Sequence, residues 1–134
     1  MEPVTGSILW RSSSYDTVGS RTEVFKSALE FNHPLFVWQG RAAKFGEKQS
    51  LLKISAPNVI LSALYREDNE FNAHLYEVEG RPVSAELEFI RPVRTAVETD
   101  FRDHKIGRLR FKDRSVFLDF KPSEIKKIKM SFQA

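Results

Sequence analysis

Hydrophobic and polar positions alternate with a period of two along most of the chain after residue 20. The clearest run lies at residues 83–89, where four apolar positions (Val83, Ala85, Leu87 and Phe89) alternate with three polar ones (Ser84, Glu86 and Glu88). This alternation is typical of a strand with one buried and one solvent-facing side. Comparable runs lie at residues 50–54, 58–66, 71–78, 93–99, 106–111, 116–120 and 124–132. Short strands at this spacing predict an all-β fold, an antiparallel β-sandwich of about 8–10 short strands.

The N-terminal third of the chain is less regular. Residues 20–29 are compatible with helical spacing, but their β-branched and aromatic side chains favour a strand at residues 23–31. Pro34 should end this strand, and the next one is predicted at residues 35–38, before a polar loop at residues 39–48. Residues 1–20 are expected to pair loosely or to stay mobile. The sequence contains no linker or repeat, so residues 1–134 are predicted to form one domain.

Residues 56–81 predict a long hairpin. Both alternating sets within residues 59–66 are mostly apolar, which predicts a strand at the centre of its sheet with little solvent on either side. Three turn formers follow (Glu67, Asp68 and Asn69), and a second strand begins at Phe71. At the far end of the hairpin, Gly80 permits a positive φ after this second strand.

The polar residues of this hairpin allow two interpretations. In the structural one, Asn58 bonds a neighbouring backbone group, and Arg81 pairs with Glu77 or with the acids of the turn. In the functional one, eight side chains form a polar face that docks on another domain or contacts sugar hydroxyls, because aromatic and charged groups suit sugar rings and hydroxyls. These candidate residues are Tyr65, Arg66, Glu67, Asp68, His74, Tyr76, Glu77 and Arg81.

Composition narrows the class of protein. A chain of 134 residues that is 41% hydrophobic can bury a core of its own. It has no cysteine, which excludes disulfides, thiolate metal sites and cysteine nucleophiles and gives no sign of an oxidising compartment. The net charge of +3 is too balanced to indicate a nucleic-acid partner. No apolar run approaches the ~20 residues of a membrane helix, so we expect a cytoplasmic protein without a membrane partner.

Candidate catalytic and metal-binding residues are few. Glu86 and Glu88 lie about 7 Å apart along one strand, a spacing not unlike that of two glycosidase carboxylates, but outward glutamates of such a strand are usually solvated. Asp100, Asp103 and His104 share one loop, where such residues usually cap the turn rather than bind a metal. We therefore assign no catalytic residue, no metal site and no cofactor to this chain.

Aromatic residues raise the question of base stacking, because the chain has eleven phenylalanines alongside its lysines and arginines. Four of them occupy positions that should point into the core: Phe89, Phe111, Phe120 and Phe132. Single-stranded nucleic-acid binding is therefore only a minor alternative.

The hairpin closely resembles a segment in the C-terminal β-sandwich of family 38 glycoside hydrolases, the α-mannosidases. The matching residues are Ala56, Pro57, Asn58, Val59, Ile60 and Leu61, then Glu67 and Asp68, then Leu75, Tyr76, Glu77, Gly80 and Arg81. Residues 28–35, 92–99 and 120–126 resemble further family segments in the same order, so the resemblance covers about residues 25–132. The sequence departs from the family pattern at His33, where an asparagine is usual, and at Ser123, where an aromatic residue is usual.

The resemblance implies a non-catalytic accessory domain of an α-mannosidase. In that family the catalytic zinc, the aspartate nucleophile and the acid belong to an N-terminal domain that has no counterpart here, so no catalytic residue carries over. The implied partner is the α-mannosidase catalytic domain, in cis or as a separate chain, and a glycan is a further potential partner. A stand-alone carbohydrate-binding module is the first alternative function.

Overall fold

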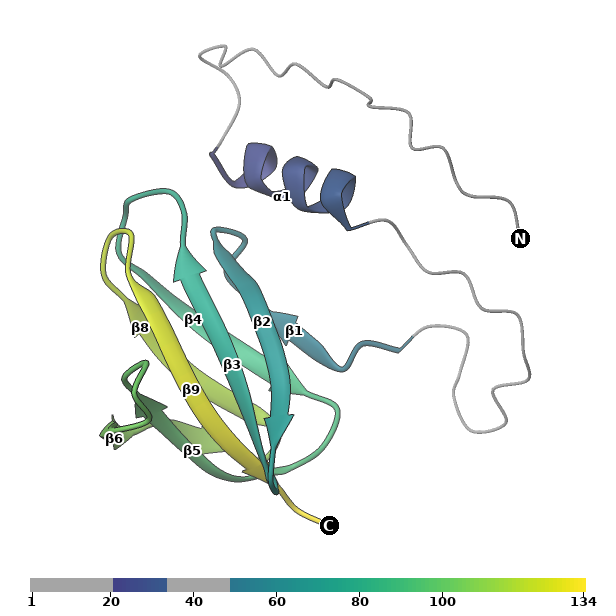
Figure 1. Cartoon of the computed structure of the whole chain (residues 1–134), viewed down its shortest axis with the longest axis vertical. Coiled ribbons are helices and arrows are strands. Elements are labelled where there is room, and N and C mark those ends of the chain that lie inside the picture. Colours follow the sequence, from purple (N-terminus) through teal and green to yellow (C-terminus); the bar gives the residue numbers. More distant parts are fainter. Residues whose placement is uncertain (1–20, 34–48) are drawn as a thin grey trace, which may run out of the picture.

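The computed structural model describes residues 21–33 and 49–134. Within these ranges the chain forms one helix and two antiparallel sheets that enclose a common core (Figure 1). The elements are α1 (Arg21–Asn32), β1 (Leu52–Ile54), β2 (Val59–Glu67), β3 (Glu70–Glu77), β4 (Val83–Phe89), β5 (Val93–Thr99), β6 (Lys105–Arg108), β7 (Arg110–Lys112), β8 (Ser115–Phe120) and β9 (Ile125–Phe132). The predicted all-β sandwich is confirmed.

The two sheets have four and five strands. The four-stranded sheet has the order β1-β4-β8-β7, and the five-stranded sheet has the order β2-β3-β9-β5-β6. The single strand predicted at residues 106–111 is divided between them, because β6 pairs with β5 and β7 pairs with β8. Leu109 forms the corner and donates its backbone N–H to the carbonyl of Ala96, 3.0 Å away.

The core lies between the sheets and is filled by alternate residues of their strands. Leu75, Leu87, Ile128 and Met130 are completely buried. The alternation predicted for residues 83–89 is confirmed, since Ala85, Leu87 and Phe89 are buried and the three polar residues that alternate with the apolar ones are exposed. Phe89 and Phe120 are core residues as expected, and Phe132 packs against the core. Phe111 is a correction: it lies on the edge strand β7 and is 42% exposed.

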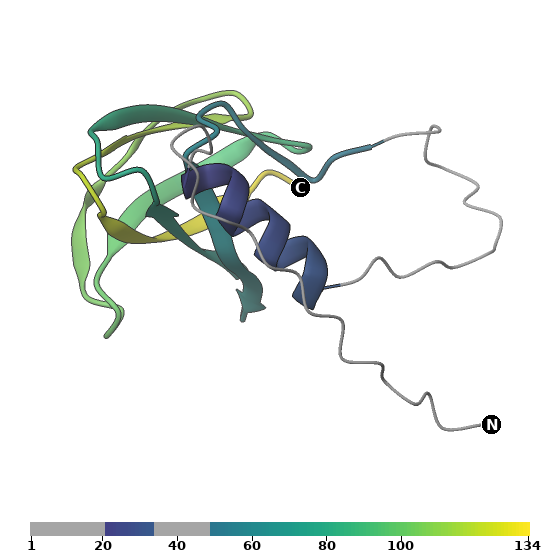
Figure 2. The ribbon, with the colours of Figure 1, turned by 90° about the horizontal axis from the view of Figure 1, so that it is seen from above.

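The strand predicted at residues 23–31 is wrong, because Arg21–Asn32 form helix α1. The segment contains good helix formers such as Lys26, Ala28 and Leu29, and no strand of the described sheets pairs with it. The first turn of the helix lies nearest the sandwich and the rest runs away from it (Figure 2). The predictions for residues 1–20, 35–38 and 39–48 lie outside the described residues.

The position predicted for the first hairpin strand is also wrong. Among the described residues β2 pairs only with β3, so it is an edge strand rather than a central one. Its burial decreases along its length, from Val59 at 3% exposure to Tyr65 at 39%. The hairpin itself is confirmed, with a β-bulge between Leu61 and Ala63 and a turn in which Asp68 adopts a φ of 54°.

Candidate functional site

The eight candidate residues of the hairpin do not form one face. Val59 pairs with Glu77 at one end of the hairpin, and Glu67 pairs with Glu70 at the other. At about 3.3 Å per residue these ends lie roughly 23 Å apart. The candidate side chains therefore fall into three groups: the buried end near the helix, the hairpin tip, and the outer side of the five-stranded sheet.

Glu77 occupies the buried end and is only 3% exposed. Its Oε1 accepts hydrogen bonds from the Asn58 side-chain amide at 2.8 Å and from the Glu79 backbone N–H at 2.7 Å. Its Oε2 accepts from the backbone N–H groups of Gly80, Ser123 and Arg81 at 2.8, 2.8 and 3.2 Å. Glu77 thus holds together three chain segments that close one end of the sandwich, and it offers no free oxygen to a docking surface.

Burial and hydrogen bonding have opposite effects on the pKa of Glu77. Burial alone would raise the pKa, but the hydrogen bonds from Ser123, Asn58, Glu79 and Gly80 outweigh burial and lower the pKa from 4.5 to about 2. The carboxylate is therefore ionised at neutral pH and cannot act as a general acid there. The expected partner of Asn58 was a backbone group, whereas its side-chain amide binds this carboxylate.

The same end of the hairpin anchors helix α1. Glu79 Oε1 accepts hydrogen bonds from the Thr22 backbone N–H at 2.8 Å and from the Thr22 hydroxyl at 2.6 Å. Phe25 packs edge-to-face on Tyr76 with ring centroids 5.8 Å apart. Tyr76 therefore serves the helix contact. Arg81 is exposed and its backbone N–H, rather than its side chain, bonds Glu77.

The hairpin tip is held by its own side chains. Arg66 donates to the Asp68 carbonyl at 2.9 Å and to Asn69 Oδ1 at 3.1 Å, and its guanidinium carbon lies 6.0 Å from the centre of the Phe71 ring. Glu67 accepts a long hydrogen bond of 3.5 Å from the amide of Asn72. These bonds give Arg66, Glu67 and Asp68 a structural role in the turn.

Tyr65 and His74 belong to a row of three rings on the outer side of the five-stranded sheet. The centroids of Tyr65 and His74 are 5.5 Å apart, those of His74 and Phe101 are 5.4 Å apart, and both pairs meet edge-to-face. Tyr65 is 39% exposed and Phe101 is 59% exposed. Phe101 was not among the candidate residues, because the loop between β5 and β6 gave no periodic signal.

Polar groups lie beside this aromatic row. The Lys127 ammonium is almost fully buried and donates to Asp103 at 2.7 Å, while Lys129 approaches the same carboxylate at 3.3 Å. The bond to Asp103 outweighs burial and raises the pKa of Lys127, and the bond from Lys127 lowers the pKa of Asp103. Asn72 and Thr99 are 0% and 4% exposed, yet Asn72 Oδ1 and Thr99 Oγ1 have no hydrogen-bond partner in the described structure.

We call Tyr65, His74, Phe101, Asn72, Thr99 and Lys127 the outer-face cluster. Strand pairing brings most of it together, since His74 lies opposite Lys127, which in turn lies opposite Thr99. Of these six residues, only Tyr65 and His74 were among the candidates predicted from the sequence. The alternation of Lys127 and Lys129 with the apolar Ile128 and Met130 could have placed both lysines on one outer face.

The residues considered for metal binding or glycosidase chemistry do not assemble into a site. Asp100 accepts from the backbone N–H groups of Arg102 and His104 and meets His104 Nδ1 at 3.0 Å, while Asp103 faces the lysines. Within residues 21–33 and 49–134, no three His, Asp or Glu side chains are grouped as a metal site requires. Glu86 and Glu88 are exposed and line an open groove over the four-stranded sheet.

The described part of the chain contains no helix that is both long enough and apolar enough to cross a membrane. Comparison of the sequence with models of known protein families finds no match. A search of curated proteins also finds no match. The resemblance to the α-mannosidase β-sandwich therefore stays a prediction.

Proposed function

We propose that this chain is a non-catalytic β-sandwich domain of an α-mannosidase, a glycoside hydrolase, and that it supports the catalytic domain in mannoside hydrolysis. The order and spacing of the matching segments over about residues 25–132 support this assignment. The all-β architecture is compatible with it. The lack of cysteine is compatible with the cytoplasmic setting that we propose for the domain.

The residues of the matching motif have structural roles, which supports a non-catalytic function. Asn58, Glu77 and Gly80 meet in one hydrogen-bonded network at the end of the sandwich. Gly80 has a φ of 72°, a conformation that favours glycine. The motif can therefore be explained by packing, with no reaction carried out by the chain itself.

The outer-face cluster carries the docking part of the proposal. A protein surface placed on its row of three rings would bury the partly exposed side chains of Tyr65 and Phe101. We therefore propose that the catalytic domain packs on this face.

Reconstitution tests this proposal. An α-mannosidase catalytic portion without its C-terminal sandwich is mixed with the full chain at micromolar concentration, and sedimentation and hydrolysis of a chromogenic mannoside are measured. We expect a complex and a gain in soluble activity. Phe101→Ala should weaken the complex about tenfold or more, because partly buried aromatic anchors dominate interface energies. Phe111→Ala removes an equally large ring from the other sheet and should have no effect.

Absence of any complex at these concentrations would refute the docking proposal. Equal weakening by Phe101→Ala and Phe111→Ala would refute the choice of face, since Phe101 lies in the loop between β5 and β6, whereas Phe111 lies on β7 of the four-stranded sheet.

The exposed rings of Tyr65 and Phe101 also favour a second candidate function, a stand-alone carbohydrate-binding module, because sugars stack on aromatic side chains. Titration with mannose oligosaccharides should then shift the NMR signals of Tyr65, His74 and Phe101 in a saturable way. A docking domain that binds no free glycan would show no such shifts.

A further inference from the structure

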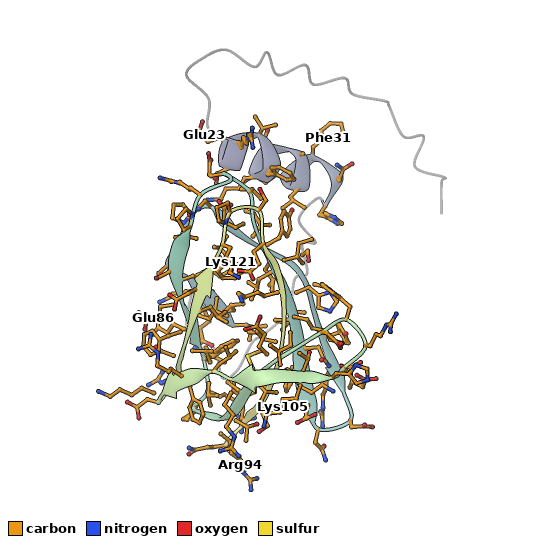
Figure 3. All side chains as sticks on the ribbon, turned by 90° about the vertical axis from the view of Figure 1, so that its left-hand side faces the viewer. Glu23, Phe31, Glu86, Arg94, Lys105 and Lys121 are labelled. Atoms are coloured by element: carbon orange, nitrogen blue, oxygen red, sulfur yellow. The ribbon has the colours of Figure 1, made fainter. Side chains whose placement is uncertain are left out.

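A second surface feature lies where the chain passes from one sheet to the other. At this corner the edge strand β6 ends, Leu109 bonds β5, and β7 begins. A hollow of about 440 Å³ opens beside it. Its lining includes Glu70, Arg94, Thr95, Lys105, Arg108 and Phe111. We call this hollow the corner pocket; Arg94 and Lys105 lie at the end of the sandwich far from the helix (Figure 3).

The corner pocket is cationic. Arg94, Lys105 and Arg108 are all exposed, and within residues 21–33 and 49–134 none of their side chains forms an ion pair or hydrogen bond. Among the described residues, its lining contains a single acidic residue, Glu70, whose carboxylate lies 3.7 Å from the Lys129 ammonium. Three cations around one hollow therefore face a single acid that is already paired, and this arrangement attracts an anion.

The wall of the pocket is partly apolar. Phe111 is 42% exposed and lies beside Leu109, which packs against the core. The volume falls within the range of small-molecule sites, about 300–1,000 Å³. An aromatic ring beside a cationic group suits a ligand that carries both an anionic end and an apolar face.

We propose that the corner pocket binds a small phosphate ester of a sugar. Arg94, Lys105 and Arg108 would hold the phosphate, whose charge near neutral pH is about −1.5 to −2. The sugar ring would lie against Phe111, and Glu70 would accept a hydrogen bond from a hydroxyl. This inference goes beyond the proposed function, because a domain that only packs on a catalytic partner needs no small ligand.

The size of the pocket favours a small ester over a polymer. Single-stranded nucleic acid needs a basic groove with successive stacking rings along it. In the part of the chain that the structure describes, the hollow is bounded by one ring, Phe111, and its three unpaired cations lie around a single volume. The test therefore includes a single-stranded oligonucleotide, and tighter binding of that nucleic acid would contradict the proposal.

The test is calorimetric titration of the full chain at low salt and about pH 7 with glucose 6-phosphate, inorganic phosphate, glucose and oligothymidylate. We expect glucose 6-phosphate to bind more tightly than inorganic phosphate, and glucose not to bind. Arg94→Gln and Arg108→Gln should each weaken glucose 6-phosphate binding roughly tenfold or more, the usual effect of losing a charged hydrogen bond. Backbone amide signals of Thr95, Val97 and Leu109 should shift on binding.

A matched pair of lysine variants provides the control. Lys105→Gln should weaken binding. Lys121→Gln makes the same charge change at an exposed position of the sandwich, toward the end where the helix lies (Figure 3), and should leave binding unchanged. Equal loss in both variants, equal binding of glucose and its phosphate, or tighter binding of oligothymidylate would each overturn the proposal. No catalytic portion is present in this experiment, so its failure leaves the docking proposal untouched.

Discussion

Replacing Glu77 with glutamine should remove the strongest polar restraint at the helix end of the sandwich. Its two oxygens accept five hydrogen bonds, three of them from the backbone N–H groups of Gly80, Arg81 and Ser123 to the same oxygen. In Glu77→Gln an NH2 group would replace one of the two oxygens. Either orientation of the amide would leave buried N–H donors facing N–H donors, which is costly.

The lowered pKa sets the size of the effect. The difference between the ordinary pKa of 4.5 and the folded value of about 2 amounts to about 3 kcal/mol, at about 1.4 kcal/mol per pKa unit. Because the folded-state pKa lies below the unfolded one, this stabilisation is complete above about pH 5. It is lost as the pH falls from about 5 to about 2.

Urea unfolding at several pH values between about 7 and 2 measures this contribution. At pH 7 the free energy of unfolding of Glu77→Gln should be lower than that of the wild type by about 3 kcal/mol. The gap should close at low pH, where the wild-type carboxyl group is also neutral. Glu86→Gln makes the same chemical change on the exposed side of β4 and should track the wild type throughout.

A constant gap between Glu77→Gln and the wild type down to about pH 2 would refute the reasoning, since the loss would then have a cause other than the charge. A gap below about 1 kcal/mol at pH 7 would show that the five hydrogen bonds merely offset the burial of the carboxylate.

Three further predictions concern other parts of the fold. Gly80→Ala should lower the free energy of unfolding by about 1–2 kcal/mol, because the positive φ of residue 80 strains any residue with a Cβ. Steric clash should add nothing, since the Cβ would meet no described atom closer than 3.7 Å. In the same urea titrations Asn69→Ala, in the other turn of the hairpin, should cost less. Thr22→Ala removes the hydroxyl bond to Glu79 and should speed amide exchange in α1 on the order of tenfold, and equal acceleration in β9 would mean that the helix is not an independent unit. Leu87→Ala, at a completely buried position, should lower the unfolding free energy by about 2–5 kcal/mol, and a loss below about 1 kcal/mol would contradict its place in the core.

Strands with one buried and one solvent-exposed side were the most predictable part of the fold. The bounds expected for β4 and β5 match the structure, and in β4 the alternation of buried and exposed residues, such as Leu87 beside Glu86, has a single physical cause, the contact of one side with the core. The position of the strand at residues 59–66 along the sequence was predicted correctly, but its position at the centre of the sheet was not. Apolar residues on both sides of a segment indicate burial, and in β2 this holds only for the first part of the strand.

Long-range contacts explain the remaining errors. The bonds between Thr22 and Glu79 join residues 57 positions apart, so the anchoring of α1 leaves no local trace in the sequence. Glu77 likewise takes a donor from Ser123, 46 positions away, whereas the sequence suggested only neighbours as its partners. Lys127 is buried although it is a lysine near the end of the chain, and its partner Asp103 lies 24 positions away in the sequence.

The position of β9 has a consequence for biosynthesis. It is the last strand in chain order, yet it lies between β3 and β5 in the middle of the five-stranded sheet. During translation β3 and β5 therefore emerge from the ribosome with open edges and wait for residues 125–132 before the sheet can close. Unpaired edges of this kind recruit other strands, so this interval is the period in which the nascent chain is most exposed to aggregation. The same arrangement suits the domain to strand complementation, in which a separate peptide with the β9 sequence fills the gap in a chain that lacks it.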